Sequence, residues 1–197
     1  MVDKESLSSL LNEVNHCQLC RDELIYEPNP ILQISTSARI LLIGQAPGRL
    51  AHEHGLPFSD PSGDRLRDWL GMDKACFYDP DRLAIMPMAF CFPGKLASGS
   101  GDKPPAKRCS QTWHARLRAQ LNNIELTLLV GRYAAAGYLD DFQDLTTRVK
   151  EQSIEDSSVL LLPHPSPRNN IWLKKNAWFE RKTLPVIRQR LQDLLNK

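Results

Sequence analysis

The sequence predicts an α/β protein, a three-layer α/β/α sandwich built on a mostly parallel four-stranded sheet. Four short apolar runs of strand length occur along the chain, and segments with helical spacing of apolar residues separate them. Strands that alternate with helices in this way favour a parallel sheet with helices on both faces. With 197 residues, 42% of them hydrophobic, the chain is expected to form one domain over residues 1–197.

The N-terminal segment predicts a helix that runs into a pair of cysteines. Over residues 6–16 the apolar side chains recur at helical spacing, namely Leu7, Leu10, Leu11 and Val14. Cys17 and Cys20 follow as a C-x-x-C pair, whose two thiols can converge on one metal ion or cluster, although redox dithiols share this spacing. Residues 28–30, Pro-Asn-Pro, indicate an extended linker.

The first strand and the loop after it indicate where a ligand binds. Residues 40–43, Ile-Leu-Leu-Ile, are typical of a strand buried on both faces. Gly44, Pro47 and Gly48 then make the backbone turn sharply. In an open α/β sheet, this carboxyl end of a strand faces the crevice that binds ligands.

The middle of the chain predicts a helix and a second strand. A polar loop with His52 and His54 is expected first, followed by a helix over residues 64–70 that a glycine ends. The second strand is expected within residues 83–90, where Pro87 interrupts the pairing.

The rest of the chain continues the alternation. An irregular stretch over residues 92–108 leads to an amphipathic helix that begins near Cys109. The two remaining strands are expected over residues 125–131 and 158–162, and further helices over residues 132–139 and 171–196. Pro185 is expected to open or kink the last helix.

Composition indicates a soluble, cytoplasmic protein. The formal net charge is only +2, so charge alone favours neither a nucleic-acid-binding tail nor a membrane surface. Residues 1–5 are charged and no long apolar run follows, so neither a signal peptide nor a membrane span is expected. Five cysteines in such a chain do not indicate a disulfide framework.

Two loops at strand ends, together with the order of the motifs around them, resemble the uracil-DNA glycosylase superfamily. The first loop reads GQAPG over residues 44–48 and is followed by HGLPFSDPSG over residues 54–63. The second reads HPSPRNN over residues 164–170. With the C-x-x-C pair and two later cysteines, the chain is most similar to the iron–sulfur branch found in bacteria and archaea. The likeness extends from Cys17 to about Trp178.

The resemblance implies a DNA glycosylase that swings a damaged nucleotide out of the stack and holds its base in a pocket. Phe58 occupies the position that stacks on the base, with a core aromatic as the alternative. His164 stands where the family keeps a donor for the departing base, with a buried, hydrogen-bonded histidine as the alternative. The other substrate-binding residues implied are Gly44, Ala46, Pro47, Gly48, Pro165, Ser166, Arg168 and Asn169.

The sequence departs from the family in its catalytic carboxylate. Many relatives carry an acid in the first loop, where this chain has Gln45 and Ala46. The Gln45 amide can orient a water or bond the base, but it does not ionise and cannot act as a base. A subgroup uses an aspartate after the stacking phenylalanine, which implies Asp60 here, with Asp64 in reserve. Asp60 before Pro-Ser-Gly is also typical of a turn or a helix cap.

The sequence also departs from the family in its base-reading residue. Several relatives use an asparagine at the end of the second strand, but residues 85–90 contain no side-chain amide. Backbone groups near Met88 are one substitute. A pocket that accepts another deaminated base, such as hypoxanthine, is the other.

Four cysteines match the thiolate order of the iron–sulfur branch: Cys17, Cys20, Cys91 and Cys109. The resemblance implies a [4Fe–4S] cluster, and tetrahedral zinc suits the same four ligands. The expected role is structural, since the site would pin residues 92–108 to the sheet. Cys76 is expected to be a packed thiol. The pinned loop carries side chains expected to contact DNA phosphates, namely Lys95, Lys103, Lys107 and Arg108.

Three functions are open on the sequence alone. The first is hydrolysis of the N-glycosidic bond of uracil, or of a related deaminated base, in DNA by a monomeric enzyme. The second is a metal-stabilised DNA-binding module of the same fold that has lost catalysis, as the missing acid at Gln45 suggests. The third is a zinc-dependent hydrolase using His52, His54 and His164, which is weaker because no pair of them has the helical spacing of a metalloenzyme.

Overall fold

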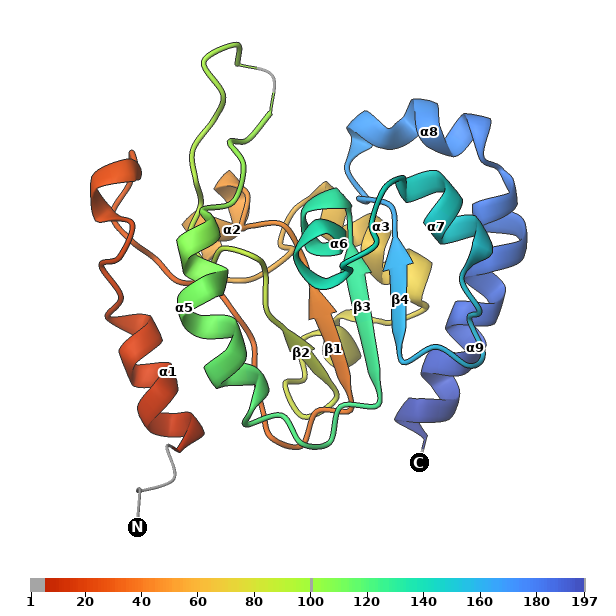
Figure 1. Cartoon of the computed structure of the whole chain (residues 1–197), viewed down its shortest axis with the longest axis horizontal. Coiled ribbons are helices and arrows are strands. Elements are labelled where there is room, and N and C mark those ends of the chain that lie inside the picture. Colours follow the sequence, from red (N-terminus) through yellow and green to blue (C-terminus); the bar gives the residue numbers. More distant parts are fainter. Residues whose placement is uncertain (1–5, 100, 197) are drawn as a thin grey trace.

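Figure 1 shows a computed structural model of the chain, which describes residues 6–99 and 101–196. Four parallel strands form its central sheet in the order β2-β1-β3-β4. The strands are β1 (Ile40–Ile43), β2 (Leu83–Ile85), β3 (Leu126–Val130) and β4 (Val159–Leu162). The predicted α/β fold with a parallel sheet is therefore confirmed. The charged residues 1–5, Ser100 and Lys197 lie outside the described residues.

The strands form because they are short apolar segments that the helices bury on both faces. Every residue of β1, β2 and β3 is buried. In the register of the sheet, Leu42 pairs with Ile85 on one side and with Leu128 on the other, and Leu129 pairs with Leu161. Such doubly covered parallel strands are uniformly apolar rather than alternating.

Helices lie on both sides of the sheet in Figure 1, with α1 and α5 towards one edge and α7 and α9 towards the other. Helix α1 packs on α5, α3 on α9, α6 on β3 and α7 on β4. The α-helices are α1 (Leu7–Asn15), α2 (Arg49–His54), α3 (Pro61–Leu70), α4 (Lys74–Phe77), α5 (Lys107–Arg118), α6 (Arg132–Tyr138), α7 (Leu145–Glu151), α8 (Asn170–Lys175) and α9 (Leu184–Leu195). Shorter helical turns are Arg21–Glu23, Pro167–Asn169 and the π-helix Phe179–Thr183.

Two predictions next to the first loop are wrong in detail. The polar loop expected around His52 and His54 is helix α2, which Gly55 ends in a left-handed conformation. Helix α3 begins at Pro61 rather than at residue 64, because the Asp60 side chain caps it by accepting from the Gly63 N–H. Proline at the first position of a helix is favourable because its missing N–H would have no partner there.

The second strand is shorter than predicted. It ends at Ile85, and Pro87 follows within two residues. The chain nevertheless stays beside the end of β1, since the Met86 N–H donates to the Leu42 carbonyl and the Met88 N–H donates to the Gly44 carbonyl, both at 2.9 Å. This segment therefore forms one wall beside the first loop.

The free edge of β2 is covered by the linker that precedes β1. Gln33 forms an antiparallel bridge with Ile85, and the Ile31 N–H donates to the Phe90 carbonyl at 2.7 Å. A covered edge is not available for pairing with another chain. Near the C-terminus, Pro185 lies in the first turn of α9 and so opens this helix.

No helix within residues 6–99 and 101–196 combines the length and the apolar character that a membrane crossing requires. The carboxyl ends of all four strands point to the upper edge of Figure 1, where a loop between β2 and α5 projects and α8 crosses above β4. This edge holds the candidate site.

Candidate active site at the carboxyl edge of the sheet

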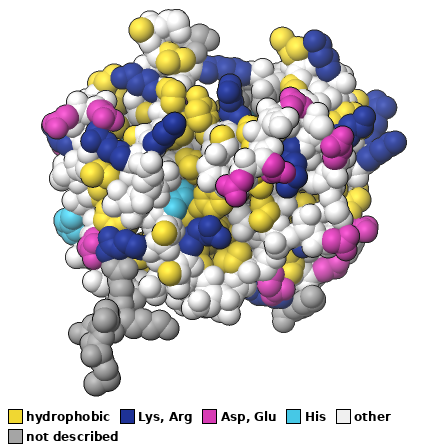
Figure 2. All heavy atoms as spheres, in the orientation of Figure 1, with side chains coloured by type: hydrophobic (Ala, Val, Ile, Leu, Met, Phe, Trp, Pro, Cys, Tyr) yellow, Lys and Arg dark blue, Asp and Glu magenta, His cyan; other side chains and the backbone are white. Residues whose placement is uncertain are grey.

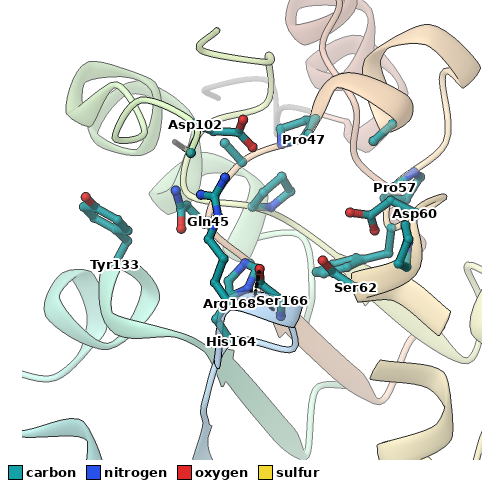
Figure 3. Close-up of a pocket in the computed structure, with 18 of the residues that line it drawn as sticks. Gln45, Pro47, Pro57, Asp60, Ser62, Asp102, Tyr133, His164, Ser166 and Arg168 are labelled. Carbon is teal, nitrogen blue, oxygen red and sulfur yellow. Dashed lines mark hydrogen bonds between the residues drawn. The ribbon is translucent and has the colours of Figure 1, made fainter. Parts of the chain in front are cut away.

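A cavity of about 590 Å³ opens at the carboxyl ends of the strands (Figure 3). The two loops predicted to share a crevice both line it. It is lined by these predicted residues: Gly44, Gln45, Ala46, Pro47, Gly48, Phe58, Asp60, His164, Ser166, Arg168 and Asn169. Met88 and Pro165 do not line it.

Phe58 forms part of the cavity wall, with its ring against the first loop. A Cβ at Gly44 would lie 3.1 Å from the tip of this ring, so the glycine allows the ring to pack directly on the backbone after β1. The ring meets Phe77 edge-on, with centroids 6.1 Å apart. Phe58 is half-buried, so its ring is anchored in the core and also borders the cavity.

The backbone of Phe58 is strained and is held by Arg67. Its φ of 53° is left-handed, which costs a residue other than glycine about 1–2 kcal/mol. The Phe58 carbonyl accepts hydrogen bonds from the Arg67 guanidinium and the Tyr78 hydroxyl, each at 3.2 Å. Arg67 is buried and pairs with Asp64 at 2.5 Å. Asp64, the reserve carboxylate, is therefore committed to this clamp and does not line the cavity.

Asp60 both caps α3 and lines the cavity. Its Oδ1 accepts from the Gly63 N–H at 3.0 Å and so caps α3. Its Oδ2 lies 4.0 Å from the position that a Cβ at Gly48 would take, on the cavity side of the first loop. The helix cap thus holds one oxygen and leaves the other in the cavity.

His164 follows β4 and carries a hydrogen-bond donor. The Ser166 N–H donates to His164 Nδ1 at 3.1 Å, so the proton of the neutral ring is on Nε2. Burial lowers the pKa of His164, and the positive charge of Arg168 acts in the same direction. The carboxylates of Asp60 and Asp102 oppose this shift. The ring is neutral at pH 7, with Nε2–H as its donor.

Helix α3 and the second loop are fastened to each other. The Arg65 guanidinium donates to the carbonyls of Pro165 and Ser166, each at 3.2 Å. The Asn169 side-chain amide donates to the His164 carbonyl at 2.7 Å. The same helix that Asp60 caps therefore positions the loop that carries His164.

The part of the wall that Pro87 forms is held by a buried histidine. His114 Nε2 donates to the Pro87 carbonyl at 3.1 Å, while its Nδ1 accepts from the Tyr138 hydroxyl at 2.7 Å. Burial lowers the pKa of His114 to about 4, so the ring is neutral. The Met88 N–H is bonded to the Gly44 carbonyl and is not available to read a base edge. The Met88 side chain instead packs against Gly137 on α6.

The cavity lining also includes residues that were not predicted, among them Tyr133 and Asp102. Tyr133 lies in the first turn of α6, directly after β3, and Asp102 lies in the loop between β2 and α5 (Figure 3). The rule that ligands bind at the carboxyl ends of strands would have indicated Tyr133. Asp102 follows no strand, and its place depends on how the long loop folds back over the cavity.

Four cysteines line a second, mostly apolar cavity of about 30 Å³. They are the predicted set, Cys17, Cys20, Cys91 and Cys109. Within the described ranges, no three His, Cys, Asp or Glu side chains are arranged to hold a single metal ion. Cys76 is half-buried, lies outside this cavity and bonds with Arg82.

Each of the four sulfurs accepts a hydrogen bond from an N–H group. The backbone N–H of Leu19 donates to Cys17, that of Asn29 to Cys91 and that of Phe90 to Cys109. The Arg108 side chain donates to Cys20. Hydrogen bonds to the sulfurs are typical of thiolates that carry negative charge and hold a metal centre. The donor set therefore fits a four-thiolate site.

The basic loop is only partly free to contact phosphate. Lys95 pairs with Asp102 at 3.6 Å, and Arg108 pairs with Glu23. The other two basic residues are Lys103, which is half-buried, and Lys107, which is exposed. In Figure 2, Lys and Arg side chains are concentrated in the upper half of the molecule, which holds the carboxyl ends of the strands.

The three histidines of the hydrolase alternative are not assembled into a metal site. The His52 ring lies against Tyr26, with centroids 5.2 Å apart, and His54 bonds to the Ser59 hydroxyl at 3.2 Å. Only His164 lines the large cavity. The arrangement gives no support to a three-histidine zinc centre within the described residues.

The fold and the cavity define a class of protein, the α/β sandwiches whose ligand site lies where the loops of a parallel sheet leave its strands. Comparison with known families is more specific. The Uracil DNA glycosylase superfamily matches residues 32–188, which is most of the chain, and the chain belongs to this superfamily. The matched range includes both cavity loops and begins after Cys17 and Cys20.

Proposed function

We propose that this protein is a DNA glycosylase that hydrolyses the N-glycosidic bond of uracil, or of a related deaminated base. The observation that carries the proposal is the neutral, half-buried His164, which lines one cavity with the ring of Phe58 and the free oxygen of Asp60. An enzyme of this kind needs an aromatic surface for the flipped base, a donor for the departing base and a carboxylate near the sugar.

The base enters the cavity and stacks on Phe58, against the backbone of residues 44–48. The carbonyl oxygen of uracil gains negative charge as the bond from C1′ to the base nitrogen breaks. The His164 Nε2–H donates to this oxygen, and a neutral donor in a buried site stabilises such charge strongly. Removal of one such donor costs about 100- to 1,000-fold in rate.

The sugar becomes positively charged as the base leaves with the bonding electrons. Asp60 Oδ2, on the cavity side of Gly48, stabilises this charge, and water then adds to C1′. Gln45 orients the water or bonds the base, since an amide both donates and accepts. Ser166, Arg168 and Asn169 at the rim contact the DNA backbone.

The hydrogen-bonding groups and the volume of the cavity determine which bases it can accept. Uracil and hypoxanthine share a carbonyl next to a ring N–H, which is the edge that deamination creates. The backbone N–H of Met88 is already bonded, and a cavity of about 590 Å³ does not limit the base to a pyrimidine. We therefore expect uracil to be released and include hypoxanthine as the second substrate to test.

The test is excision from single-stranded and duplex oligonucleotides that carry one uracil or one hypoxanthine, with abasic sites revealed by alkali. Wild-type protein should give breaks at uracil, and His164→Ala should slow them about 100-fold or more. Breaks at hypoxanthine alone would keep the chemistry and change the substrate. Strands that are bound but intact would support the alternative, a DNA-binding module without catalysis.

We also propose that Cys17, Cys20, Cys91 and Cys109 hold a [4Fe–4S] cluster, with zinc as the alternative. The four N–H···S contacts and the shared cavity support four thiolates around one centre. Zinc would need the same sulfurs about 2.3 Å from one ion, so the metal content of the purified protein decides between the two. When bound, the group supplies a structural cross-link between the N-terminal segment and α5.

Protein purified without oxygen should be brown and contain about four iron atoms per chain if the cluster is present. Cys109→Ser should lose both the colour and part of the thermal stability, whereas Cys76→Ser should keep both. A colourless protein with one zinc per chain would contradict the cluster and retain the site. Protein without either metal that melts at the same temperature as Cys109→Ser would contradict the site itself.

A further inference from the structure

A hairpin between β2 and α5 carries a carboxylate over the cavity. Lys95 and Asp102 form an antiparallel bridge. The Leu96 N–H donates to the Gly101 carbonyl at 2.9 Å, and the Lys103 N–H donates to the Gly94 carbonyl at 2.8 Å. These bonds fix the backbone on both sides of Asp102, so its position is built into the fold.

The carboxylates of Asp102 and Asp60 both lie close to Gly48 in the cavity. A Cβ at Gly48 would lie 3.8 Å from Asp102 Oδ2 and 4.0 Å from Asp60 Oδ2. The two carboxylates approach the cavity from different sides in Figure 3, Asp102 from the hairpin and Asp60 from the start of α3. The negative charges of both carboxylates also raise the pKa of His164, against the larger effect of burial. The first loop has no acid of its own, and two acids from elsewhere in the chain lie near its Gly48.

The two carboxylates differ in what holds them. Asp60 Oδ1 is committed to the Gly63 N–H at 3.0 Å, as the cap of α3. Asp102 Oδ1 faces the Lys95 ammonium at 3.6 Å, and its side chain is 35% exposed. A partly solvated carboxylate at the cavity mouth can meet a water molecule, whereas a capping carboxylate is fixed in place and suits the stabilisation of a charge.

We propose that Asp102 is the catalytic base of this reaction and accepts the proton of the attacking water. This inference rests on the proposed glycosylase function. The bond between C1′ and the base nitrogen breaks, and its electron pair leaves with the base. The water oxygen forms the new bond to C1′, and its proton passes to the Asp102 carboxylate. Asp60 stabilises the positive sugar between these events. Gln45, whose amide does not ionise, does not have to accept a proton.

The alternative role for Asp102 is structural, as the partner of Lys95 in the hairpin. The charged and titratable groups near Asp102 are Lys95 on its own hairpin, Asp60 before α3, and Arg168 and the neutral His164 after β4. A structural role would change the melting temperature or DNA binding. A base would change the rate of the chemical step.

The experiment compares wild type, Asp102→Asn, Asp102→Glu and the control Asp140→Asn. Asp140 is exposed and lies after α6, away from the cavity. The full-length proteins are measured in single turnover, with protein in excess over an oligonucleotide carrying uracil, or hypoxanthine if that is the base released. Affinity for the same DNA and melting temperature are measured in parallel.

Asp102→Asn should slow the single-turnover excision step on the order of 100-fold. Its DNA affinity should be equal or higher, because a negative charge near the phosphates has been removed. Asp102→Glu should recover part of the rate, and Asp140→Asn should match wild type. An Asp102→Asn rate equal to wild type, or a slow rate explained by weaker DNA binding or a lower melting temperature, would overturn the assignment.

The proposed function and the role of Asp102 fail in different ways. Wild-type protein that releases no base contradicts the glycosylase function and, with it, any catalytic base. Wild-type protein that releases base while Asp102→Asn does so equally well contradicts the role of Asp102 alone.

Discussion

The two oxygens of Asp60 explain why a sequence could support two interpretations of one residue. The segment Asp-Pro-Ser-Gly is a favourable start of a helix, and Oδ1 does cap α3. The same cap fixes the carboxylate so that Oδ2 faces the cavity beside Gly48. Capping and charge stabilisation are therefore compatible, and substitutions can separate them.

Asp60→Asn should keep the cap, since asparagine caps helices about as well as aspartate, and should change the free energy of unfolding by less than about 0.5 kcal/mol. Asp60→Ala should lose the cap at a cost of about 1 kcal/mol. Both should lose excision, because neither carries a negative charge at the sugar. Urea unfolding and single-turnover excision check this pair, and an Asp60→Asn protein with the wild-type rate would remove Asp60 from the mechanism.

His114 makes stability depend on pH in a defined window. Its pKa is lowered to about 4 by burial, below the value of about 6.5 in the unfolded chain. Between these values the unfolded chain takes up a proton that the folded protein excludes, so stability falls as the pH falls from about 6.5 to about 4. The loss from this group is about 3 kcal/mol.

His114→Phe should be less stable than wild type at pH 7, because the hydrogen bonds of His114 with the Pro87 carbonyl and the Tyr138 hydroxyl are lost. Its stability should also fall less steeply between pH 6.5 and 4. Denaturant unfolding at several pH values checks this slope. Parallel curves for the two proteins would mean that His114 does not titrate as described; His164, present in both, does not affect the comparison.

Helix α3 organises the site because three of its contacts reach other parts of the cavity wall. Its cap places Asp60, its Arg67 holds the strained Phe58, and its Arg65 fastens the loop after β4. The start of α3 lies directly against the Phe58 backbone, and a Cβ at Gly63 would overlap the Phe58 carbonyl. Only glycine allows this approach.

Gly63→Ala should therefore destabilise the protein by about 3 kcal/mol or more, since a backbone atom has to move. The matched control is Gly55→Ala, where φ is 64° and no atom lies within 4 Å of the new Cβ, so the cost should be the left-handed strain of about 1–2 kcal/mol. Thermal or urea unfolding of the two variants tests the difference. Equal losses would show that the Phe58 backbone can relax away from α3.

The elements that the sequence predicted well are those defined by apolar pattern. All four strands were found because doubly buried strands are continuous apolar runs, and residues 40–43 match β1 in full. Helix α2 was missed because only Ala51 of its six residues is buried, which leaves no apolar periodicity to detect. The predicted start of α3 was too late because proline and glycine, here Pro61 and Gly63, usually break helices. The cap at Asp60 outweighs them.

The whole molecule shows what topology can predict about a site and what it cannot. The meeting of the loops after β1 and β4 was predictable, because parallel strands end at one edge of the sheet. The place of Asp102 was not, because it depends on the hairpin folding back so that the Arg168 guanidinium lies against Gly101. The ion pair between Lys95 and Asp102 was likewise not predictable, and it engages a lysine that the sequence analysis expected to contact DNA phosphates.

The most direct measurement of the proposed chemistry is the mass of the products. A uracil-containing oligonucleotide would be incubated with excess wild-type protein, without alkali, and analysed by mass spectrometry together with the small molecules released. We predict free uracil and a full-length strand with the mass of an abasic site, in equal amounts. An oligonucleotide that is fully bound yet unchanged in mass, for uracil and for hypoxanthine alike, would contradict hydrolysis at this cavity and leave a DNA-binding protein.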